Sequence, residues 1–361
     1  MRDKTEIQEE ALAAILPLQR AGCGMSMGTG KTLLGLRHMS VNYTDYVRYL
    51  VTAPKTSIFT TWIEEAKNNG LEYLLSHIQF TTYISLSKQS LDYDVVYLDE
   101  CHSLLSSHES WLDQFRGKII GLSGTPPKYE RSEKGKMVAK FCPIVYKYVT
   151  DDAVEDKILN DYKIIIHKIS LDKARTIKVE KKGKIWFTSE QATYDYWSNR
   201  LENAVHKKEE QIMRVMRMKS LMGFPSKEVL AKSILDNTNE KVILFANTQE
   251  QADRLCKYSY HSKNPDSEVN LEQFKCGNIL KLSCVLQLNE GVNILNLRAG
   301  ILMHSYGNER KASQRIGRLM RLNPDDVATI HVLCYKGTVD EYWVKHALED
   351  LDESKITWKD G

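Results

Sequence analysis

Residues 25–32 read Met-Ser-Met-Gly-Thr-Gly-Lys-Thr, and this stretch decides which fold to expect. A short apolar run precedes it, and the helix-like segment Leu-Leu-Gly-Leu-Arg-His-Met follows at 33–39. A strand, a glycine-rich turn and a helix start leave successive backbone N–H groups free to hold phosphate oxygens, and the helix dipole assists them. Met25 stands where such loops usually have their first glycine. The stretch still predicts a nucleotide phosphate loop after a buried strand.

Each residue of this loop has an expected task. Gly28, Thr29 and Gly30 would form the tight turn around the phosphates, because glycine tolerates that backbone path. Lys31 would reach the β- and γ-phosphates of ATP, and the Thr32 hydroxyl would hold Mg²⁺. The alternative is a chance Gly-Thr-Gly-Lys-Thr in an ordinary turn.

A pair of acids provides the context that favours a nucleotide site. Asp-Glu-Cys-His at 99–102 follows the apolar run Val-Val-Tyr-Leu at 95–98. An acid at the end of a strand near a phosphate loop can bind Mg²⁺ through water, while its neighbour orients and deprotonates the attacking water. We therefore expect Asp99 to be the metal residue and Glu100 the catalytic base. A plain strand exit that happens to carry two acids is the alternative.

The hydrophobic pattern predicts an α/β protein with two domains. Strands alternate with helices such as 56–69, which is typical of a mainly parallel sheet with helices on both faces. The alternation resumes after a break, so we expect domain 1 at 1–147, a linker at 148–162 and domain 2 at 163–361. The expected strands are 46–52, 95–98, 118–123, 163–167, 241–246, 278–283 and 329–333.

Residues 171–236 interrupt the second alternation. Thr-Ile-Lys-Val and Ile-Trp-Phe-Thr on either side of Glu-Lys-Lys-Gly-Lys predict a β-hairpin, and a long helical stretch follows. Lys181, Lys182 and Lys184, near Trp186 and Phe187, could grip nucleic acid and stack on its bases. The alternative is a surface hairpin that packs against the helical insertion.

Composition sets the remaining limits. The chain has 361 residues, of which 42% are hydrophobic and 27% charged, so two folded domains are expected. Its net charge of +3 does not by itself indicate nucleic-acid binding. The seven cysteines contain no CxxC pair, which argues against a disulfide framework or a zinc site. No apolar signal region or stretch of about 18 apolar residues is present, so a cytoplasmic protein is expected.

At these motifs the sequence resembles superfamily 2 helicases, a family of ATP-driven nucleic-acid motors built from two RecA-like domains. Asp-Glu-Cys-His matches the DExH signature of that family. Further motifs occur in the family's order in the first half: an adenine-reading glutamine at Gln8, motif Ia at 52–55, a strand-contact motif at 80–83 and motif III at 123–127. The resemblance implies ATP and Mg²⁺ as ligands.

The second half resembles the family's motifs IV, V and VI at 244–248, 288–294 and 314–321. Gln-Arg-Ile-Gly-Arg-Leu-Met-Arg at 314–321 matches the motif VI pattern Gln-x-x-Gly-Arg-x-x-Arg. The resemblance makes Arg318 and Arg321 arginine fingers and Gln314 a contact of the γ-phosphate, and it adds Gly291 to the nucleotide site. It also implies phosphate contacts with nucleic acid, without sequence specificity, through Thr52, Lys55, Thr82 and Asn293.

These motifs together predict a DNA helicase or translocase that acts on branched or forked DNA. Arginines supplied by domain 2 would make hydrolysis depend on closure over domain 1. The chain is expected to be a monomer, with a protein partner for targeting and a phage-encoded origin. The alternatives are a duplex translocase of the Swi/Snf type, an RNA helicase, a small-molecule phosphotransferase, which leaves the second half unexplained, and an inactive scaffold.

Overall fold

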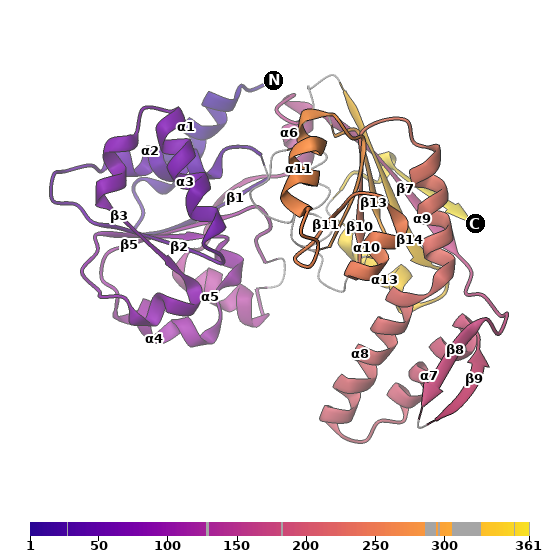
Figure 1. Ribbon diagram of the computed structural model, residues 1–361. Coiled ribbons are helices and arrows are strands. Elements are labelled where there is room, and N and C mark those ends of the chain that lie inside the picture. Colours follow the sequence, from indigo (N-terminus) through magenta and orange to yellow (C-terminus); the bar gives the residue numbers. More distant parts are fainter. Residues whose placement is uncertain are drawn as a thin grey trace. The chain divides into compact units, whose positions relative to one another are not determined.

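The computed structural model describes residues 1–26, 28–127, 130–181, 183–285, 294, 297–304, 326–349 and 351–360. The structure divides into two units: unit 1 includes Met1–Asp161, and unit 2 begins at Tyr162. The colours of Figure 1 follow the residue number along the chain. Each unit has its own sheet and its own buried core.

Unit 1 is built on a six-stranded sheet in the order β3-β2-β4-β5-β1-β6, in which every neighbouring pair is parallel. All residues of β2 and β4 are buried, as expected for parallel strands that are covered on both faces. The strands are β1 (Arg20–Met25), β2 (Tyr49–Ala53), β3 (Ile78–Thr82), β4 (Val95–Asp99), β5 (Lys118–Ser123) and β6 (Ile144–Tyr148).

Helices cover both faces of this sheet. Val96 and Leu98 of β4 belong to a core cluster with side chains of α4 and α5. Tyr97 points to the opposite face, because side chains alternate along a strand, and its ring meets that of Trp62 on α3. The helices are α1 (Lys4–Ile15), α2 (Lys31–Val41), α3 (Ser57–Asn68), α4 (Glu109–Gln114), α5 (Glu133–Phe141) and α6 (Thr150–Glu155), and short 3₁₀ turns include Tyr83–Lys88 and Cys101–Ser103.

The segment expected to link the domains, 148–162, instead belongs almost entirely to unit 1. It holds the end of β6, all of α6 and the first residues of β7. The Asp156 carboxylate accepts a hydrogen bond from the Arg2 backbone N–H at 2.9 Å, and the Ser26 and Thr150 hydroxyls are 2.9 Å apart. The chain passes from unit 1 to unit 2 between residues 161 and 162. These long-range contacts are what hold a charged segment to unit 1.

Unit 2 is built on a seven-stranded sheet in the order β11-β12-β10-β13-β14-β7-β15. The neighbouring pairs from β11 to β14 are parallel, and so is the pair of β7 and β15. The strands are β7 (Asp161–Ile169), β10 (Val242–Ala246), β11 (Ser259–Tyr260), β12 (Lys281–Val285), β13 (Ala299–Leu302), β14 (Val327–Tyr335) and β15 (Ile356–Asp360). The sequence analysis did not predict β11, β13 or β15.

The insertion begins with the predicted hairpin, β8 (Ile177–Lys181) and β9 (Lys184–Thr188), which pairs antiparallel and forms its own two-stranded sheet. The long helix expected after it is broken at residues 203–206, so that α7 (Glu190–Glu202) and α8 (Lys207–Gly223) are separate. A further helix begins at Pro225, where the missing N–H costs nothing. The other helices are α9 (Pro225–Asn237), α10 (Gln249–Leu255), α11 (Ser267–Cys276) and α13 (Val339–Ala347).

The expected fold class is confirmed: both units are α/β with mainly parallel sheets. Among the described residues, no helix has the length and apolar character required to cross a bilayer.

Candidate nucleotide site

The turn between β1 and α2 has the backbone geometry that a phosphate loop needs. Gly28 and Gly30 have left-handed φ angles of 86° and 91°, which strongly favour glycine. A Cβ atom on Gly30 would lie 2.0 Å from Nε2 of Gln8. Within the described part of the chain no side chain caps α2 at Gly30, so the first N–H groups of the helix face no capping oxygen. The turn can therefore receive an anion at the helix start.

Gln8 fastens α1 to this turn. Its side-chain amide is buried, and Nε2 donates to the carbonyls of Thr29 and Gly30 at 3.4 and 3.2 Å. Its Oε1 is also buried and accepts no hydrogen bond from the described residues. An unused acceptor inside a protein costs about 1 to 3 kcal/mol. This atom fits a donor group of a bound ligand, such as the amino group of adenine.

Two polar side chains of the loop form hydrogen bonds with backbone carbonyls of the same loop. The Thr29 hydroxyl donates to the Ser26 carbonyl at 2.7 Å. Lys31 directs Nζ back over the loop, 3.1 Å from the Met25 carbonyl and 3.2 Å from the Ser26 carbonyl. Thr32 is half-buried in the first turn of α2. Lys31 and Thr32 thus both lie where the glycine turn passes into α2.

The acid pair lies at the end of β4. Asp99 is buried, and its Oδ2 accepts from Nε1 of Trp62 at 2.8 Å while its Oδ1 accepts from the backbone N–H of Glu100 at 2.9 Å. Glu100 has a left-handed φ of 50°, which is uncommon for a residue with a side chain. Backbone strain of this kind persists only where the surrounding structure enforces it. Such residues concentrate at functional sites.

A polar chain connects the acid pair with the next predicted motif. Nδ1 of His102 lies 3.3 Å from Oε2 of Glu100 and 2.8 Å from the Ser123 hydroxyl. The Ser123 hydroxyl also accepts from the backbone N–H of Thr125 at 3.1 Å. The structure thereby joins residues 99–102 to residues 123–125. His102 and Ser123 were not among the expected site residues, although both stand inside motifs that were recognised.

Parallel strands bring the loop and the acids to one edge of the sheet. Asp99 of β4 and Cys23 of β1 both pair with Leu122 of the intervening strand β5. Strands lie about 4.8 Å apart, so about 10 Å separates the two strand ends. A hydrogen bond with Cys142 and burial hold the pKa of the adjacent Cys101 thiol well above its usual value, which favours the protonated thiol.

The expected nucleic-acid contacts of unit 1 differ in their exposure. Lys55 is exposed just after β2, and Thr82 is half-buried at the end of β3. Thr52, by contrast, is fully buried in the middle of the sheet, paired with residues of β3 and β4. Its side chain therefore does not reach a nucleic acid, and that assignment does not fit the structure.

Several expected residues lie outside the described part of the chain. They are Gln314, Arg318, Arg321, Gly291, Asn293 and Lys182, and the side chain of Lys181 is likewise not described. Lys184 is described and is exposed on the hairpin.

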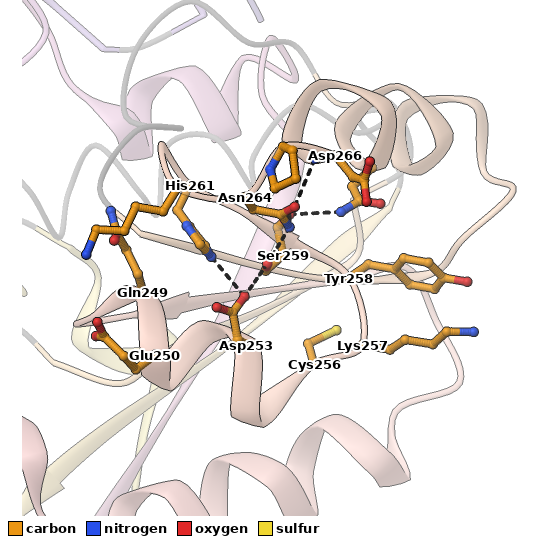
Figure 2. Close-up of a pocket in the computed structure, with 13 residues that line it drawn as sticks. Gln249, Glu250, Asp253, Cys256, Lys257, Tyr258, Ser259, His261, Asn264 and Asp266 are labelled. Atoms are coloured by element: carbon orange, nitrogen blue, oxygen red, sulfur yellow. Dashed lines mark hydrogen bonds and ion pairs between the residues drawn. The ribbon is translucent and has the colours of Figure 1, made fainter.

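Unit 2 has a cavity of about 500 Å³ between α10 and the start of α11 (Figure 2). Asp253 accepts from Nε2 of His261 at 2.8 Å and from the Ser259 hydroxyl at 2.6 Å, and Asn264 in turn donates to Ser259. The hydrogen bond from His261 and that from Ser259 lower the pKa of Asp253. These groups bind one another and fasten β11 to α10, so the cavity's polar groups have a structural role.

Comparison with known proteins agrees with this geometry. Residues 226–323 match the model of the helicase conserved C-terminal domain. The chain is 26% identical to the DNA 3'-5' translocase XPB2 of Sulfurisphaera tokodaii, over 94% of this chain and 84% of that protein. The comparisons support a superfamily 2 helicase-type motor.

Solved structures have a similar fold over nearly the whole chain. The restriction-modification enzyme LlaBIII, solved bound to DNA, is 16% identical with a TM-score of 0.64 over 100% of this chain, which spans only 31% of that enzyme. A fragment of an HsdR subunit of a type I restriction enzyme from Vibrio vulnificus is 17% identical, with a TM-score of 0.63 over 99% of this chain and 67% of the fragment.

Proposed function

We propose that this protein is an ATP-driven DNA motor, a translocase or helicase that couples ATP hydrolysis to movement along DNA. The observation that carries the proposal is the sheet edge of unit 1, where a left-handed glycine turn and an acid pair with a strained Glu100 follow parallel strands. The similarity to a DNA translocase over 94% of the chain supports DNA as the partner.

The residues of this edge fit ATP with Mg²⁺. The turn of Gly28, Thr29 and Gly30 would hold the phosphates by its backbone, with Lys31 on the β- and γ-phosphates. Thr32 and Asp99 would hold the metal ion, which when bound neutralises charge on the phosphates. Oε1 of Gln8 would accept from the adenine amino group.

Glu100 would act as the base. Its left-handed backbone and the neighbouring His102 fix the carboxylate, so it can orient a water molecule and take its proton. Trp62 and the Glu100 N–H meanwhile hold the carboxylate of Asp99 as an anion acceptor. The two acids thus have separate tasks.

Unit 2 would complete the site on closure. By the match to motif VI, Arg318 and Arg321 would stabilise the charge of the transition state and Gln314 would contact the γ-phosphate, while Gly291 would line the site. An arginine supplied in this way is worth about 10³ to 10⁵ in rate. Closure and reopening would then move the nucleic-acid contacts of one domain relative to those of the other.

DNA would be held mainly through its phosphates, by Lys55, Thr82 and Asn293. Such contacts carry affinity and little sequence information. We propose branched or forked DNA as the substrate.

ATP turnover measured with single-stranded, duplex and forked DNA and with RNA tests the proposal. We expect DNA to stimulate turnover, most strongly when forked. Duplex as the best activator would indicate a duplex translocase, and RNA would indicate an RNA helicase.

The variants Lys31→Ala and Glu100→Gln should each abolish DNA-stimulated turnover. Lys67→Ala and Glu72→Gln, at exposed positions of the same unit, are matched controls that should retain it. Full turnover in Lys31→Ala and Glu100→Gln would remove this site from consideration.

A further inference from the structure

The β8–β9 hairpin leaves large apolar side chains uncovered. Ile185, Trp186 and Phe187 are consecutive on β9, and 55%, 44% and 56% of their surfaces are exposed. Figure 1 shows the hairpin as a ribbon of two strands, distinct from the large sheet of unit 2. Three such residues in a row on a surface usually mark a binding site.

The two faces of the hairpin each present one aromatic ring and one lysine. Side chains alternate along a strand, so Trp186 lies on one face and Phe187 on the other. Phe187 pairs directly with Lys178 across the hairpin, which places their Cβ atoms about 5 Å apart. Lys184 is two residues from Trp186 and therefore shares its face.

The hairpin region is also basic. Residues 171–188 contain six lysines or arginines against two acids, a surplus of four, whereas the whole chain has a net charge of +3. Lys173, Arg175, Lys178 and Lys184 are all exposed, and none forms an ion pair with another described residue. Repulsion among these uncompensated cations is relieved by a polyanion.

Hydrogen bonds of one buried carboxylate hold the base of the hairpin. Glu190, the first residue of α7, is buried and accepts from the backbone N–H of Asp172 at 3.0 Å, which precedes β8. It also accepts from the backbone N–H and the hydroxyl of Ser226 at 2.9 and 2.8 Å. Glu190 thereby connects both ends of the hairpin segment to the start of α9, so the base of the hairpin is held in position.

We propose that the β8–β9 hairpin binds single-stranded nucleic acid, with bases stacked on Trp186 and Phe187 and phosphates held by Lys178 and Lys184. This inference rests on the proposed motor function and names a second contact in unit 2. Bases offer their faces to side chains only in unpaired strands, and stacking tolerates any sequence. A protein partner fits less well, because lysine is depleted in protein interfaces, while here a lysine lies beside each aromatic residue.

Equilibrium binding of a labelled single-stranded DNA oligonucleotide to the full chain, without ATP, tests the proposal. The double variant Trp186→Ala and Phe187→Ala should lose about 10-fold or more in affinity, because stacked bases are lost. Trp186→Tyr with Phe187→Tyr should retain most of it, since tyrosine also stacks. Tyr46→Ala, which removes an exposed aromatic ring of unit 1, is the matched control and should bind as the unchanged protein does.

The outcomes separate this proposal from the motor function. Unchanged single-strand affinity in the alanine pair would overturn the hairpin contact, whatever the ATPase assay shows. Loss of self-association in that pair, with unchanged affinity for DNA, would assign the surface to a second copy of the chain and also overturn it. Because the measurement omits ATP, an inactive nucleotide site would leave the binding result readable.

Discussion

Two buried polar clusters, one in each unit, differ in what holds their charged and polar groups. In unit 1, Oε1 of Gln8 has no donor among the described residues, and Glu100 is held in a strained conformation. In unit 2, the Asp340 carboxylate is shared among Lys227, His304 and the backbone N–H of Tyr335. The first cluster combines a strained backbone with an acceptor that a ligand could use, whereas the second holds together distant segments of unit 2 through a buried ion pair.

Breaking the second cluster should have the largest effect. Lys227→Met removes the cation beside the fully buried Asp340, and loss of one partner of a buried pair costs about 3 to 5 kcal/mol. The free energy of unfolding, from urea denaturation, measures this loss. Lys232→Met, at an exposed pair with Asp236, is the control and should cost less than about 1 kcal/mol. Equal losses in the two variants would contradict the anchoring role.

The same cluster predicts acid sensitivity. Burial alone would raise the pKa of Asp340, but the charges of Lys227 and His304 outweigh it and lower the pKa to about 2. Because the folded pKa lies below the unfolded value of about 3.9, this stabilisation is present above pH 4 and lost as the pH falls toward 2. Asp340→Asn should flatten the fall in unfolding free energy over that range. An unchanged slope would show that the charge on Asp340 is not what is lost.

Breaking the first cluster should instead affect activity. Gly30→Ala strains a left-handed φ and drives a Cβ atom against Gln8, so ATP turnover should fall by about 100-fold or more, or about 2.7 kcal/mol. Gly277→Ala has a similar φ of 80° but meets nothing within 4 Å. Gly277 ends α11 in unit 2, so this variant is a control for strain at a left-handed glycine outside the nucleotide turn and should retain turnover. An equal loss of turnover in both variants would contradict a specific role of the Gly30 turn.

The buried His38 of unit 1 makes the stability of the protein depend on pH. Burial, with a smaller effect of Lys118, lowers the pKa of His38 to about 4. The folded state then binds a proton less readily than the unfolded state, so stability is lost as the pH falls below about 6.5. At pH 5 the loss is about 2 kcal/mol. His38→Asn, which keeps a partner for Tyr97, should remove that part of the pH dependence, whereas His206→Asn at an exposed position should not.

The smallest expected effect concerns the hairpin lysines. Lys178→Ala with Lys184→Ala should reduce the slope of log affinity against log salt by about 1.4 for single-stranded DNA, since each phosphate contact contributes about 0.7. Lys207→Ala with Lys208→Ala on α8 removes the same charge from exposed positions away from the hairpin strands and should leave the slope unchanged. Equal slopes in both pairs would show that net charge, rather than the hairpin, sets the salt dependence.

Much of the fold could be predicted where the local pattern was strong. The strand at 118–123 was located to the residue, and the predicted hairpin around Gly183 is present. Edge strands were missed, because β11 is two residues long and β6 alternates in burial within a charged segment. The helix break at residues 203–206 was also missed, since no proline or glycine marks it.

The sequence by itself determined the left-handed turn at Gly28 and Gly30, the acids at a strand end and the resemblance to helicase motifs, because each depends on residues close together in the chain. Tertiary structure alone decided that Thr52 is buried, that Gln8 keeps an unused acceptor and that Glu190 roots the hairpin. Those properties depend on strand order and on contacts between distant segments, since burial is set by what packs on both sides of a strand.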